Sequence, residues 1–152
     1  MRLLARPTHA AQEIYARACL EGAELSFAVG VEHLVLACAV LSPVLEEYGV
    51  TPDDIRERIR ADERDALASL GISLESVRGE LEERFGDDVW TQPCGLGVSP
   101  EAKRVLELAT RRRRTVTPEQ MLAALIAHSA TARRLLFDLD VPVGTLAERL
   151  RR

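Results

Sequence analysis

Two glutamates, each expected in the first turn of a helix, are the residues of this chain best placed to bind a ligand. Glu32 lies in the segment Gly-Val-Glu-His-Leu and Glu119 in the segment Thr-Pro-Glu-Gln-Met. A carboxylate can hold a planar guanidinium through a two-point fork, and a helix N-terminus offers free backbone amides to an anion. The alternative is capping alone, because a first-turn acid stabilises a helix through its dipole. The candidate ligand-binding residues are Val31, Glu32, Thr117, Pro118 and Glu119.

Four consecutive arginines, Arg111, Arg112, Arg113 and Arg114, form the one run of like charge. Cations suit the negative end of a helix dipole, so a solvated helix terminus is one interpretation. A patch for anions or nucleic acid is the other. No aromatic residue is interleaved with the arginines and the chain has a formal charge of −4. Nucleic acid is therefore not the favoured partner.

Histidines and cysteines give little support for catalysis. His33 follows Glu32, but adjacent helical residues point about 100° apart, and no second His or Cys lies at ligand spacing. His9 and His128 are far away in sequence. We therefore expect a structural His33 and no metal site or cofactor, and we expect the protein not to be an enzyme.

The three cysteines are odd in number and form no C-x-x-C pair. Cys19 and Cys38 lie on apolar helix faces, where small buried side chains are expected. Cys94 lies in a Pro-Cys-Gly loop and is left as the alternative nucleophile.

Helices must position these residues. The 152-residue chain is 47% hydrophobic and 29% charged, which is typical of a globular domain. Alanine, leucine, arginine and glutamate dominate, and such side chains lose little freedom in a helix. No segment alternates like a strand, and no apolar run approaches the roughly 20 residues of a membrane-spanning helix. We expect an all-α fold in one domain, residues 1–152.

Two parts of the sequence repeat each other. Residues 8–14 align with residues 99–105, and residues 30–34 align with residues 117–121. Start signals support four helices in each copy. Thr117 can cap a helix with proline at its first position and glutamine completing a capping box, and residues 51–54 repeat this arrangement with acids.

We expect repeat one at residues 8–60 and repeat two at residues 99–151, packed about a pseudo-twofold axis. That packing is expected to bring the helix starts around Glu32 and Glu119 together. The predicted core consists of apolar residues at helical spacing: Ile14, Leu34, Leu36, Leu45, Ile55, Val105, Leu122, Leu125, Leu136 and Leu146.

The residues between the repeats, 61–98, form a predicted helical insert and linker. Residues 67–72 echo residues 45–50 in their Leu-x-x-x-Gly-apolar pattern, which indicates a partial third copy. A helix is expected from Leu74 to Phe85. The following stretch, which includes Trp90, lacks periodicity and is expected to be a flexible linker.

The segment Gly-Val-Glu-His-Leu-Val-Leu-Ala, residues 30–37, resembles the Gly-Thr-Glu-His-Leu-Leu-Leu-Ala motif of the N-terminal domain of Clp/Hsp100 unfoldases, most closely the ClpC type. Residues 44–50 and 99–108 support the resemblance, which covers about two thirds of the chain. It implies two four-helix repeats packed as a pseudo-dimer. In those unfoldases the domain receives substrates and adaptors and precedes two ATPase modules. This sequence contains no G-x-x-x-x-G-K-[ST] motif, so we expect a stand-alone relative without ATP turnover.

The resemblance also implies a ligand, because each repeat of the ClpC type can bind phosphoarginine through its motif glutamate. Glu32 and Glu119 match those glutamates. The arginine that the family tends to carry near the start of each repeat is replaced by Ala10 and Glu101, and an acid at position 101 repels phosphate. We expect weak or no phosphoarginine binding, and better binding of unmodified peptide or partner protein through apolar surface between the repeats.

The predicted function is a protein- or peptide-binding accessory of the Clp proteolytic system: an adaptor, a substrate-capture module or a decoy. The alternatives are an anion- or nucleic-acid-binding protein that uses the arginine run, and an enzyme that uses Cys94 or His33. The N-terminus has no apolar segment long enough for a secretory signal. We therefore expect a cytoplasmic protein.

Overall fold

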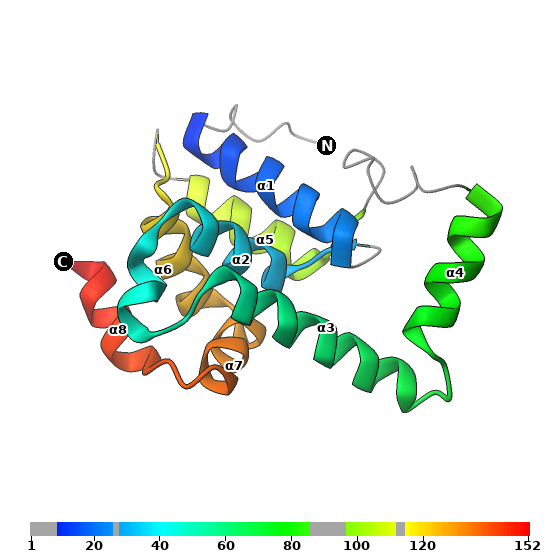
Figure 1. The fold of residues 1–152 in the computed structure, drawn as a ribbon. Coiled ribbons are helices and arrows are strands. Elements are labelled where there is room, and N and C mark those ends of the chain that lie inside the picture. Colours follow the sequence, from blue (N-terminus) through cyan, green and yellow to red (C-terminus); the bar gives the residue numbers. More distant parts are fainter. Residues whose placement is uncertain (1–8, 26–27, 86–96, 112–114) are drawn as a thin grey trace.

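The structure is a computed structural model that describes residues 9–25, 28–85, 97–111 and 115–152. Within these ranges the fold is all-α, as predicted, and the β structure is confined to one two-stranded pairing (Figure 1). The elements in chain order are α1 (His9–Leu25), β1 (Ala28–Val29), α2 (Val31–Leu41), the 3-10 helix η1 (Pro43–Tyr48), α3 (Pro52–Ala68), α4 (Leu74–Phe85), β2 (Gly97–Val98), α5 (Pro100–Thr110), α6 (Pro118–His128), α7 (Ala130–Asp138) and α8 (Val143–Arg151). None of the described helices has the length and apolar character to cross a membrane.

The helices begin where capping residues predict. Thr51 and Thr117 each accept a hydrogen bond from the backbone N–H three residues on, at 3.3 and 3.2 Å, and each opens a helix with proline next. Ser99 caps α5 in the same way, accepting from the backbone N–H of Ala102 at 3.1 Å. Thr8, which aligns with Ser99, lies outside the described residues. These local bonds satisfy amides that a helix start leaves unpaired.

Three helix ends share one hydrogen-bonding pattern, the Schellman motif. After η1, the N–H of Val50 donates to the carbonyl of Leu45 and the left-handed Gly49 (φ 79°) donates to Glu46. The same pair of bonds surrounds Gly71 after α3 and Asp140 after α7. Residues 67–72 therefore share this helix-ending motif with residues 45–50, and their assignment as a partial third copy stays a prediction.

Helix α2 is the centre of the core. It contacts α1, α3, α5, α6 and α7, and most of its residues are buried. All ten predicted core residues are at most 1% exposed, which confirms that prediction. The side chain of Ser42, at the C-terminal end of α2, bonds to Glu119 in the first turn of α6. The N-terminal end of α2 lines a groove together with α7, and α7 begins where α6 ends. The start of α2 therefore lies toward the C-terminal end of α6. Helices α2 and α6 therefore run antiparallel.

The C-terminal part of α3 and helix α4 form an arm that projects from this body (Figure 1), whereas buried Ile55 and Ile59 hold the first part of α3 in the core. Helix α3 runs through residue 60, where we predicted the end of repeat one, and ends at Ala68. Helix α4 spans Leu74–Phe85, the bounds predicted for the helix of the insert. Leu70, in the turn between the two helices, is 73% exposed. The assignment of residues 8–60 and 99–151 as superimposable repeats stays a prediction.

Candidate functional site

Glu32 lies at the start of α2, where the backbone is capped by a histidine. The N–H of Gly30 donates to Nδ1 of His33 at 2.9 Å, so that nitrogen is the unprotonated one. His33 is fully buried, and burial lowers the pKa of its imidazole. The Glu32 carboxylate folds back over Gly30, where an added β-carbon would come within 2.5 Å of it. Its side chain is 33% exposed.

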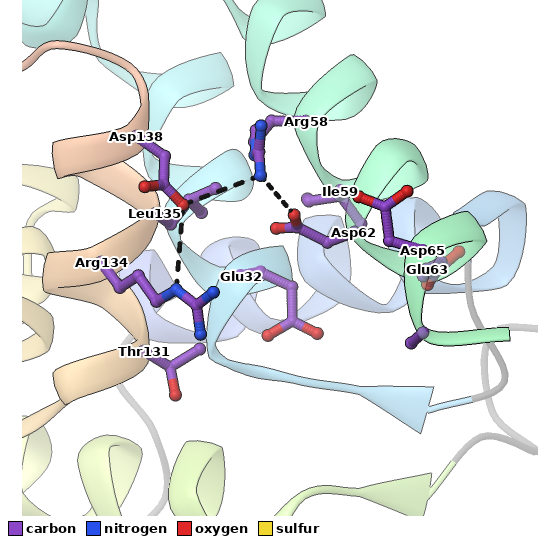
Figure 2. Close-up of a pocket in the computed structure, with 11 residues that line it drawn as sticks. Glu32, Arg58, Ile59, Asp62, Glu63, Asp65, Thr131, Arg134, Leu135 and Asp138 are labelled. Atoms are coloured by element: carbon purple, nitrogen blue, oxygen red, sulfur yellow. Dashed lines mark hydrogen bonds and ion pairs between the residues drawn. The ribbon is translucent and has the colours of Figure 1, made fainter. Parts of the chain in front are cut away.

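A groove of about 510 Å³ opens beside Glu32, between α3 and α7 (Figure 2). Buried Ile59 and Leu135 supply its apolar lining. In the close-up, Glu32 lies between Thr131 and Arg134 of α7 on one side and Asp62 of α3 on the other. The lining residues are Glu32, Arg58, Ile59, Asp62, Glu63, Asp65, Ala66, Thr131, Arg134, Leu135 and Asp138.

The two arginines of this groove already have acidic partners. Arg58 donates to Asp62 at 2.7 Å, and its Nη2 lies 3.9 Å from Asp138. Arg134 also lies 3.9 Å from Asp138 (Figure 2). Among the described residues, no Lys or Arg lies within ion-pairing distance of the carboxylates of Glu32 and Asp65. The groove therefore presents free negative charge above an apolar lining.

Glu119 has a different environment. Its carboxylate accepts a 2.6 Å hydrogen bond from the hydroxyl of Ser42, the residue that ends α2. This bond lowers the pKa of Glu119 below its ordinary value. Since Ser42 and Glu32 lie at opposite ends of α2, the starts of α2 and α6 do not converge. Our expectation of convergence is wrong, because the two helices pack antiparallel.

A third glutamate explains why Glu32 is not engaged in the same way. Ser129 ends α6 as Ser42 ends α2, and by the sequence alignment it is the natural partner for Glu32. Its hydroxyl instead donates to Glu101 at 2.7 Å, and Glu101 also accepts from Thr131 at 3.0 Å. Glu101 lies in the first turn of α5, at a position that repeat one fills with Ala10. The Ser129 hydroxyl is therefore already engaged by Glu101 and does not bond to Glu32.

The other candidate ligand-binding residues have structural roles in the helices. Val31 is 1% exposed and packs in the core. Thr117 caps α6, and Pro118 occupies its first position. Ligand binding by these residues stays a prediction. The structure does not bring the two halves of the candidate set into one site.

The arginine run begins at Arg111, which is exposed and ends α5. Arg112, Arg113 and Arg114 lie outside the described residues, so the predicted anion patch stays a prediction.

The remaining candidates for chemistry do not assemble into a site within the described part of the chain. Cys19 and Cys38 are buried, as predicted, and burial raises the pKa of the Cys38 thiol far above its ordinary value. Cys94 lies outside the described residues. His128 is exposed at the end of α6. No three His, Cys, Asp or Glu side chains that the structure describes converge as metal ligands.

Sequence reasoning missed two charged clusters. One is the groove, whose acids come from α3 and α7 and carry no motif. The i, i+4 spacing of Arg58 and Asp62 predicts their pairing but not the neighbouring helix. The other is buried Glu21, which accepts from Arg56 at 2.7 and 3.0 Å and pairs with Arg17 at 3.3 Å. In the sequence, the burial of Glu21 is indicated only by the apolar residues that share its face of the helix.

Comparison with known proteins places the fold. No family model and no curated protein sequence matches this chain. Among solved structures, the N-terminal domain of the caseinolytic protease associated chaperone ClpD from Arabidopsis thaliana is similar over 97% of this chain and 94% of that chain. The TM-score is 0.68 and the identity 21%. This chain therefore has the all-α fold of a Clp N-terminal domain.

Proposed function

We propose that this chain is a protein- or peptide-binding accessory of a Clp-type proteolytic system, with no catalysis of its own. The observation that carries the proposal is the match in fold, along nearly the whole chain, to a domain of a protease-associated chaperone. The groove beside Glu32 supports it, because ligand sites are concave and combine apolar lining with a few placed polar groups. Substrate capture, adaptor action and decoy action all require that the chain binds a protein or peptide.

Binding of unfolded protein tests the proposal directly. The probe is a permanently unfolded, carboxymethylated model protein, titrated against the chain by fluorescence anisotropy, with the same protein in its folded, disulfide-bonded form as the control. We expect saturable binding of the unfolded probe and at least tenfold weaker binding of the folded one. Equal affinity for the two forms, or no binding of either, would contradict the proposal.

A second measurement separates binding from catalysis and from the alternative partner. Calorimetric titration with ATP and magnesium should give no heat of binding. Titration with a short DNA duplex should give no saturable signal at about physiological salt, because net negative charge opposes polyanion binding. Saturable DNA binding that is lost on Arg111→Ala would favour the arginine run as the functional surface instead.

A further inference from the structure

The charge of this protein is distributed unevenly around α3 and α7. A second groove, of about 470 Å³, adjoins the first and shares Arg58 and Asp138 with it. Asp54, Glu57 and Asp140 add to its lining. Together the two grooves carry eight carboxylates and two guanidiniums, a formal charge of −6. Since the whole chain carries −4, the remainder has a charge of +2, and the negative potential is concentrated here.

The lining is not uniformly polar, which distinguishes this surface from a solvated acidic face. Buried Ile59 and Leu135 line the first groove, and buried Val50 and half-buried Leu139 line the second. A surface that alternates apolar lining with acidic rim complements a segment that alternates basic and apolar side chains. Arginine suits it best, because its apolar stem can lie on the leucines while its planar head forks to a carboxylate.

We infer that the joined groove between α3 and α7 binds an extended peptide segment carrying unphosphorylated arginines. The inference rests on the proposed function and names the ligand class. Glu32 and Asp65 would receive the guanidinium groups, because no Lys or Arg of the described residues lies within ion-pairing distance of them and the neighbour of Glu32, His33, is neutral. Asp62 and Asp138 are held by Arg58. A phosphate on the arginine is excluded by charge, since both lining arginines face acids already. A metal ion does not compete, because the described acids do not converge on one point.

The test compares three labelled peptides of one length in fluorescence anisotropy titrations. The first alternates arginine and leucine, the second has citrulline in place of arginine, and the third has phosphoarginine. Citrulline keeps the shape of arginine without its charge. We expect the arginine peptide to bind at least tenfold more tightly than either of the others, and its affinity to fall as salt is raised.

Matched variants locate the site. Glu32→Gln and Asp65→Asn together should lower the affinity for the arginine peptide at least tenfold. Glu107→Gln removes the same kind of charge from an exposed position of α5 outside both grooves and should change affinity less than twofold. Equal binding of arginine and citrulline peptides, tighter binding of phosphoarginine, or an equal loss in Glu107→Gln would each overturn the inference.

The outcome separates this inference from the proposed function. If the unfolded model protein binds and the arginine peptide does not, the ligand class is wrong and the protein-binding function stands. If neither probe binds, both are wrong. Unchanged helical circular dichroism of each variant excludes loss of fold as the cause of weakened binding.

Discussion

Replacing His33 by glutamine should make the stability of this protein less sensitive to acid. His33 is fully buried at the third position of α2, where Nδ1 accepts the N–H of Gly30. Gln120 holds the equivalent position of α6, where its side-chain oxygen accepts the N–H of Thr117 at 3.1 Å. Glutamine can therefore keep the capping bond of His33 while removing the titrating group.

The direction of the effect follows from proton linkage. Burial lowers the pKa of His33 below 6.5, so below about pH 6.5 the unfolded chain takes up a proton that the folded chain does not. The free energy of unfolding then falls with acidification by up to ~1.4 kcal/mol per pH unit, until the pH reaches the folded pKa. The stability that is lost on acidification is fully present well above pH 6.5, where His33 is neutral in both the folded and the unfolded chain. By pH 5.5 the loss can reach at most about 1.4 kcal/mol, which is a sizeable part of the roughly 5–15 kcal/mol typical of a domain.

Urea unfolding followed by circular dichroism at about pH 7.5, 6.5 and 5.5 measures this loss. The difference in slope between the parent chain and the variant reports the contribution of His33 together with its coupling to Glu21 and Glu32. His128→Gln is the matched control, because it removes an exposed imidazole at the end of α6. A His33→Gln variant with the parent slope would refute the reasoning, as would an equal flattening in His128→Gln.

Three further changes test the packing and the turns. Glu21→Ala leaves Arg56 without its buried partner and should cost ~3 kcal/mol in urea unfolding, discounted from the usual range because Arg56 is 23% exposed. Asp140→Gly should raise stability by up to ~1 kcal/mol, because Asp140 adopts a left-handed φ of 59°, whereas Gly49→Ala at φ 79° should lower it by a similar amount. Leu125→Ala should lower the thermal midpoint and cost ~2–5 kcal/mol, as expected for a fully buried leucine. Stability changes of opposite sign, or below about 0.5 kcal/mol for Leu125→Ala, would contradict these assignments.

The fold could be predicted from the sequence because its signals are local. The capping residues Thr51, Ser99 and Thr117 act within three positions of themselves, and helical periodicity marks the side that enters the core. The insert helix could be delimited for the same reason. The continuation of α3 beyond residue 60 could not be predicted. A repeat alignment marks where sequence similarity stops and carries no information about where a helix stops.

The site could not be predicted because its contacts are distant in sequence. Ser42 and Glu119 are 77 positions apart, and Ser129 and Glu101 are 28 apart. Arg58 and Asp138 come from α3 and α7, and their approach depends on how both helices pack against α2. Charge patterns along one helix report on its own face and do not show which charged helix lies opposite.

Two glutamates at matching positions can therefore have different chemistry without any difference in their own segments. Glu32 and Glu119 both lie in the first turn of a core helix, and a serine ends the helix that runs beside each of them. At Glu119 that serine is available, and the carboxylate is used in holding α2 to α6. At Glu32 the serine is already bonded to Glu101, so the carboxylate faces the groove. Glu101 thus decides, from a third helix, which of the two motif glutamates can meet a ligand. Glu101→Ala should offer Ser129 to Glu32, and in the peptide titration it should weaken arginine binding although no residue that lines the groove is substituted.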